Sequence, residues 1–84
     1  MRYLYQERGD KMIKYSFTLI KYGHEVKFCD ITEDTYNKTI NEVNDIEDSK
    51  LIHEWTTEYK ESILYAKEYR FKSNILILWK EVQK

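Results

Sequence analysis

The sequence predicts an α+β fold in which two helices pack on one face of a three- or four-stranded, antiparallel-rich sheet. Three observations lead to this fold class. Apolar and polar residues alternate over 11–21, apolar residues recur at helical spacing over 32–70, and an unbroken apolar run occupies 75–79. A chain of 84 residues has room for one domain, spanning 1–84. The expected element order is β-(β)-β-α-α-β.

A β-hairpin is expected first. One alternating set of the segment 11–21 is apolar, comprising Ile13, Tyr15, Phe17 and Leu19. Gly23 then supplies a turn, because glycine accepts a positive φ without cost. A second strand follows over 25–31 with Val26 and Phe28 toward the core. Residues 1–11 are expected to be either a short strand or a flexible N-terminal arm.

Two helices and a central strand complete the predicted fold. Thr32 is a candidate N-cap, and the acidic first turn after it favours a helix that ends near Asn44. A longer helix is predicted from about residue 49 to about residue 70. Its apolar positions would lie on one narrow arc, formed by Ile52, Trp55, Tyr59, Ile63 and Ala66. The run 75–79 is apolar on both faces, which predicts a strand in the middle of the sheet.

Charge is segregated along the chain although the net charge is only −1. Residues 30–68 carry a net −7, whereas 1–29 and 69–84 each carry a net +3. On the long predicted helix the glutamates would gather on one face around a tyrosine. This acidic surface, the predicted protein-binding site, comprises Glu47, Glu54, Glu58, Glu61, Tyr65 and Glu68. It could imitate nucleic-acid phosphates or dock in the basic groove of a larger protein, or be only a solvated helix face.

The basic residues give an alternative site. The solvent face of the predicted sheet could hold single-stranded nucleic acid by phosphate contacts and base stacking. The candidate residues are Lys14, Lys27, Arg70, Lys72 and Lys80. A sequence pI near 6.1 is less typical of a nucleic-acid binder.

No motif for catalysis or ligand chemistry is visible. The two glycines stand alone, and the single cysteine with two histidines is too few for a structural zinc site. We therefore expect no enzyme activity, no cofactor and no metal. The lack of a long apolar segment or a secretory pattern favours a cytoplasmic, intracellular protein without membrane contact.

The leading hypothesis is a small non-enzymatic binding module that inhibits or modulates a larger protein through the acidic, tyrosine-containing helix. In composition the chain is similar to small accessory proteins that act by binding, including phage-encoded anti-defence inhibitors. The first alternative is a small regulator that binds RNA or single-stranded nucleic acid. A homodimer, in which surplus aromatic side chains become buried, is a further possibility.

Overall fold

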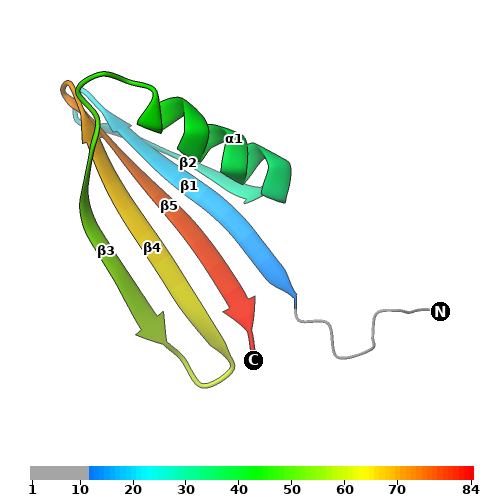
Figure 1. Cartoon of the computed structure of the whole chain (residues 1–84). Coiled ribbons are helices and arrows are strands. Elements are labelled where there is room, and N and C mark those ends of the chain that lie inside the picture. The colour runs from blue at the N-terminus through cyan, green and yellow to red at the C-terminus, as the bar shows by residue number, and fades with distance from the viewer. Residues whose placement is uncertain (1–11) are drawn as a thin grey trace.

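The computed structural model describes residues 12–84, so the prediction for 1–11 lies outside the described residues. Six elements follow one another along this part of the chain (Figure 1). They are strands β1 (Ile13–Lys21) and β2 (His24–Ile31), helix α1 (Glu33–Asn44), and strands β3 (Lys50–Glu58), β4 (Ser62–Phe71) and β5 (Asn74–Gln83).

The strands form a single antiparallel sheet in the order β2-β1-β5-β4-β3, and α1 lies across one of its faces (Figure 1). The predicted α+β fold class is therefore wrong. The sheet has five strands instead of three or four, and the described chain has one helix instead of two. The central position predicted for 75–79 is confirmed, since β5 is the middle strand of the sheet.

The error lies in 49–70, which is predicted as one long helix and folds as β3, a tight turn and β4. Trp55 of β3 stands opposite Ala66 of β4, and Ala66 in turn stands opposite Trp79 of β5. The helical spacing of the apolar residues is thus coincidental. The segment is rich in β-branched and aromatic residues, which fit a pleated surface better than a helix. The turn between the two strands contains no Gly, Pro or Asn, so no residue typical of turns indicates where one strand ends and the next begins.

The strands and the turn of the predicted first hairpin are confirmed, whereas the core positions predicted for Val26 and Phe28 are wrong, because both side chains face the helix side but remain exposed. Tyr22 and Gly23 form the two-residue turn of this hairpin, and both have positive φ, of 55° and 78°. This is the backbone of a type I′ turn, whose twist matches that of the strands it joins. Near its other end β2 contains a bulge, where the register with β1 shifts and Asp30 takes a φ of 56°.

Helix α1 begins and ends where the sequence predicts. The hydroxyl of Thr32 accepts a hydrogen bond from the backbone N–H of Thr35 at 3.1 Å, and Asp45 follows the last helical residue. The helix buries Tyr36 and Val43 against the sheet. The main core lies between α1 and the sheet, and its buried residues are Tyr15, Tyr36, Val43, Tyr69, Leu76 and Leu78.

Three phenols meet within this core, and we call Tyr15, Tyr36 and Tyr69 the tyrosine cluster. The rings of Tyr15 and Tyr36 have centroids 4.7 Å apart. Burial raises the pKa of all three phenols above the ordinary value. Nearby carboxylates raise the pKa further, that of Glu33 for Tyr15 and that of Glu54 for Tyr69. The core is therefore built around uncharged tyrosines.

Candidate functional site

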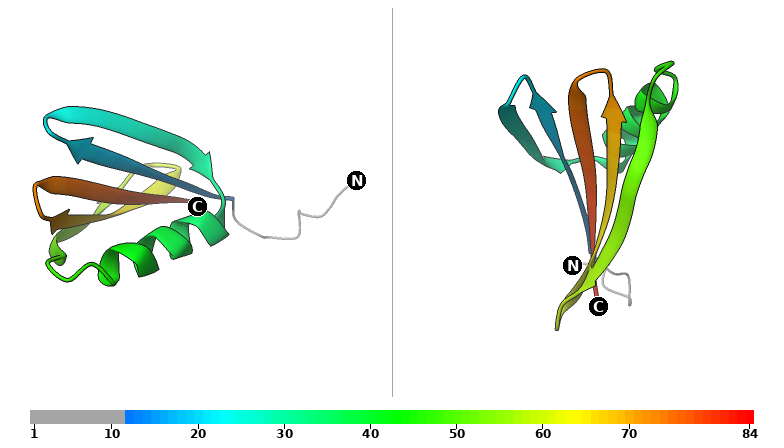
Figure 2. Two further views of the ribbon diagram at one scale, coloured as in Figure 1. Left: turned by 90° about the horizontal axis from the view of Figure 1, so that it is seen from above. Right: turned by 90° about the vertical axis from the view of Figure 1, so that its left-hand side faces the viewer.

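The face of the sheet opposite α1 is the candidate site. Figure 2 shows the helix on one side of the sheet only, and no other element within residues 12–84 lies over the second side. We call this second side the open face. Because directly opposed residues in an antiparallel sheet share a face, the strand register assigns its members.

Large apolar side chains occupy the middle of the open face. All of them are partly buried by their neighbours on the same face, with nothing described above them. This apolar centre consists of Ile20, Trp55, Leu64, Ile75, Ile77 and Trp79. On the opposite side of β5, by contrast, Leu76 and Leu78 are buried beneath α1.

The two tryptophans give the apolar centre a defined geometry. The indole N–H of Trp79 donates a hydrogen bond to the hydroxyl of Thr18 at 3.1 Å. The ring of Trp55 stands edge-on to Trp79, with centroids 5.8 Å apart and an interplanar angle of 89°. Ala66, only 1% exposed, lies between them in the strand register. The small side chain of Ala66 leaves room for the two indoles to meet edge to face.

An aromatic row continues from Trp55 to the β3 edge. The imidazole of His53 lies 4.8 Å from the Trp55 ring, and its Nδ1 is 3.9 Å from the carboxylate of Glu68 on β4. His53 is exposed, so this contact is the outer end of the row.

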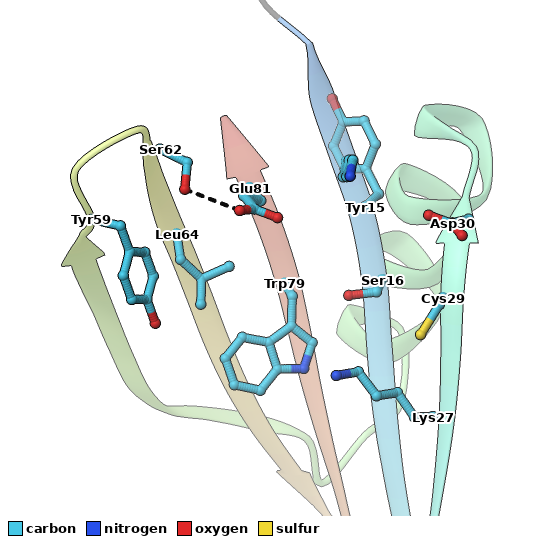
Figure 3. A pocket seen from close by; sticks show the side chains of 11 residues that line it. Tyr15, Ser16, Lys27, Cys29, Asp30, Tyr59, Ser62, Leu64, Trp79 and Glu81 are labelled. Atoms are coloured by element: carbon cyan, nitrogen blue, oxygen red, sulfur yellow. Dashed lines mark hydrogen bonds between the residues drawn. The ribbon is translucent and has the colours of Figure 1, made fainter. Parts of the chain in front are cut away.

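A hollow of about 640 Å³ opens on the same face (Figure 3). Trp79 lies in it, with Tyr59 and Leu64 on one side and Lys27 on the other, as Figure 3 shows. The hydroxyl of Ser62 donates a hydrogen bond to Glu81 at 3.0 Å. The hollow is lined by Lys14, Tyr15, Ser16, Lys27, Cys29, Asp30, Tyr59, Ser62, Leu64, Trp79 and Glu81.

Charges of both signs surround the apolar centre. The charged residues that the register assigns to the open face are Lys14, Glu25, Lys27, Lys50, Glu68, Arg70 and Glu81. The cations outnumber the anions by a single charge. The open face is therefore neither a strongly basic nor a strongly acidic surface.

The predicted acidic helix is wrong, because the segment that should carry it is a β-hairpin. Glu47 lies in the connection after α1, and Glu61 lies in the turn between β3 and β4. Glu54 points to the helix side of the sheet, whereas Glu68 points to the open face. Glu58 is paired with the ammonium group of Lys84 at 2.7 Å, which lowers the pKa of its carboxyl. The residues thus form no common acidic stripe.

Part of the predicted surface does assemble, but with cations. Beside α1 the residues Glu54 and Tyr65 line a smaller hollow of about 290 Å³ together with Lys67 and Lys80. The tyrosine predicted to sit among glutamates therefore has lysines as its neighbours.

The predicted basic site is divided between three places. Lys14, Lys27 and Arg70 lie on the open face, as the alternative hypothesis requires. Lys80 lies on the helix side, and Lys72 lies in the turn between β4 and β5. Sequence reasoning missed Trp55 and Tyr59 as surface residues because it placed both in a helix core. The adjacent Thr56 and Thr57, favourable in strands, were the available signal.

Reactive groups are sparse in the described chain. Cys29 is a free, exposed thiol, and residues 12–84 contain no group of three side chains suited to holding a metal ion. Within the same range, no helix has both the length and the apolar character that a membrane crossing requires. Comparison with protein-family models finds no matching family, and comparisons with curated proteins and with solved structures find no match.

Proposed function

We propose that this chain is a small non-enzymatic binding module that inhibits or modulates a larger protein, and that it binds this protein through the open face. One observation carries the proposal. A sheet normally packs another layer on each apolar face, and here a face rich in tryptophan and isoleucine has no described layer over it.

The make-up of the open face favours a protein as its partner. Specific protein interfaces have an apolar, aromatic centre inside a polar rim, and their strongest contacts come from Trp, Tyr and Arg. On the open face Trp79 and Ile77 lie on the central strand β5, and Trp55 of β3 contacts Trp79. Arg70 lies near the end of β4, and Lys27 lies on the edge strand β2. A rim of both signs complements a protein surface of mixed charge better than a uniformly negative phosphate backbone.

The proposal is tested by a pull-down from nuclease-treated lysate of the organism that encodes the chain, with matched variants. Ile77→Glu places a charge in the apolar centre, and Lys38→Glu makes a charge change on exposed α1. We expect the wild-type chain and Lys38→Glu to retain one protein in stoichiometric amount, and Ile77→Glu to lose it while keeping the wild-type circular dichroism spectrum. A partner retained equally by Ile77→Glu, or no partner at all, contradicts the proposal.

Binding of single-stranded nucleic acid is a second candidate, favoured by the contents of the hollow. Trp79 and Tyr59 offer ring surfaces for base stacking, and Lys14 and Lys27 lie at the same hollow to meet phosphates. With three of the four open-face cations, Lys14, Lys27 and Arg70, on phosphates, affinity for a short oligonucleotide should fall roughly twenty-fold between 50 and 200 mM salt. Quenching of tryptophan fluorescence on titration with the oligonucleotide measures this affinity at each salt concentration. Binding whose affinity does not fall with salt excludes phosphate contacts.

A further inference from the structure

The outer edge of β2 is complementary to itself. We propose that two copies of this chain pair β2 with β2 in antiparallel orientation, which joins their sheets into one sheet of ten strands. In this arrangement Val26 lies on the twofold axis, and Glu25 of each copy stands opposite Lys27 of the other.

The backbone of β2 is oriented for such pairing. In a two-residue turn the C=O of Lys21 bonds to the N–H of His24, so this pair is hydrogen-bonded. Hydrogen-bonded and non-hydrogen-bonded pairs alternate along an antiparallel ladder. Val26 therefore bonds inward to β1, whereas the N–H and C=O groups of Glu25 and Lys27 point away from the sheet. β2 is an edge strand, and no described strand receives these outward groups.

Only one register satisfies both the backbone and the charges. With the axis at Val26, both Glu25–Lys27 pairs fall at hydrogen-bonded positions, and each couples opposite charges. With the axis at Lys27 two lysines oppose one another, and with the axis at Glu25 two glutamates do, and both arrangements are destabilising. An axis at Phe28 would bring the bulge at Asp30 into the ladder. The axis at Val26 is thus the favoured arrangement.

The apolar side chains at this edge are also free to meet a second copy. Val26 is 48% exposed and Phe28 is 45% exposed, so α1 leaves this end of β2 uncovered. Both residues face the helix side, where Phe28 stacks on Phe17 of β1 at 4.8 Å. Pairing through the axis would bring the two Val26 side chains together and extend this apolar strip across both copies.

The opposite edge of the sheet is protected against the same event. The hydrogen bond from the N–H of Tyr59 to the C=O of Ser62 sets the alternation along β3. By this alternation, the N–H and C=O groups of Glu54, Thr56 and Glu58 point away from the sheet. A second β3 centred on Thr56 would oppose glutamate to glutamate, and one centred on Trp55 or Thr57 would oppose glutamate to threonine, so none of these registers couples opposite charges. The pairing is therefore expected at β2 and not at β3.

The oligomeric state of the full chain tests the proposal. The pairing is short, so we expect a weak dimer, seen as a rise toward twice the monomer mass in sedimentation equilibrium as concentration increases. Lys27→Glu should weaken the dimer roughly ten-fold or more, because symmetry turns two attractive pairs into repulsive ones. The double variant Glu25→Lys with Lys27→Glu should restore it, and Lys38→Glu on α1 should leave it unchanged. A monomer at every concentration, or a dimer insensitive to Lys27→Glu, overturns the proposal.

A disulfide tests the register by itself. At a non-hydrogen-bonded antiparallel pair the Cα atoms lie about 4.5 Å apart, which a disulfide can span. In a Cys29→Ser background, Val26→Cys should therefore crosslink two copies under oxidised glutathione. His24→Cys is the matched control, because its counterpart would lie roughly 13 Å away along the strand. Equal crosslinking by both variants, or none by Val26→Cys, contradicts this register.

Discussion

Leu78 and Ile77 are adjacent on β5 and point to opposite faces of the sheet, Leu78 to the covered face and Ile77 to the open face. Comparing the stability of Leu78→Ala with that of Ile77→Ala therefore tests the one-sided architecture. Leu78 is 0% exposed beneath α1, whereas Ile77 is only partly buried on the open face. Truncating a fully buried leucine costs about 3–5 kcal/mol, since it removes apolar contact and leaves a closed cavity. Truncating Ile77 leaves a gap that water can enter, so its cost is about 1–2 kcal/mol.

The assay is urea unfolding followed by tryptophan fluorescence at low micromolar concentration. A domain of this length has a free energy of unfolding of roughly 4–13 kcal/mol, so Leu78→Ala should remove a large part of that stability. If Leu78→Ala does not fold, Leu78→Val and Ile77→Val give the same comparison with smaller losses. Equal costs for the two positions would mean that a further layer already covers Ile77, and would refute the one-sided core.

Three further predictions concern single features of the fold. Thr32→Ala should lower the free energy of unfolding by about 1 kcal/mol in urea titrations, because it removes the N-cap of α1; no change would mean that water replaces the cap. Because the pKa values of the tyrosine cluster are raised in the folded chain, the unfolded chain loses its phenolic protons at a lower pH than the folded chain does. The free energy of unfolding should therefore keep its full value below about pH 10 and fall as the pH rises above it. Urea titrations between pH 8 and 11 measure this loss, and Tyr36→Phe should reduce its slope. Thr18→Val should leave the indole N–H of Trp79 without its acceptor at a cost of about 1 kcal/mol, and a shift in tryptophan emission reports the change.

The parts of the fold that the sequence predicts correctly are those with local signals. Gly23 marks the turn of the first hairpin, and Thr32 marks the start of α1. Both act through the conformation or hydrogen bonding of a few neighbouring residues, so a single sequence contains the information. The central strand is predicted because a run of five residues that is apolar on both faces is typical of a strand flanked by neighbouring strands.

The hairpin of β3 and β4 could not be recognised in the same way. Glutamates at 47, 54, 61 and 68 repeat every seven residues, a spacing that also fits a helix face. What decides the structure is long-range, since Ala66 lies between tryptophans of two neighbouring strands. Tertiary packing of this kind overrides local helical spacing. The predicted acidic site does not exist because the helix that should carry it does not form. Lys14 and Lys27 lie on the solvent face of the first hairpin as the sequence predicts, because the alternation of that hairpin is a clear local signal.

The two proposals meet at β2, because Glu25 and Lys27 lie both at the rim of the open face and at the proposed pairing edge, so each affects the other. Directly opposed residues share a face, so pairing at β2 would bring the two open faces onto the same side of the combined sheet. A partner with two matching sites would then be held by both, and its apparent affinity would exceed that of a single face by 10²–10⁴-fold, as a rough order of magnitude. Lys27→Glu should therefore weaken binding to such a partner without touching the apolar centre, and the charge-swapped double variant should recover it. Ile77→Glu should abolish binding in either oligomeric state.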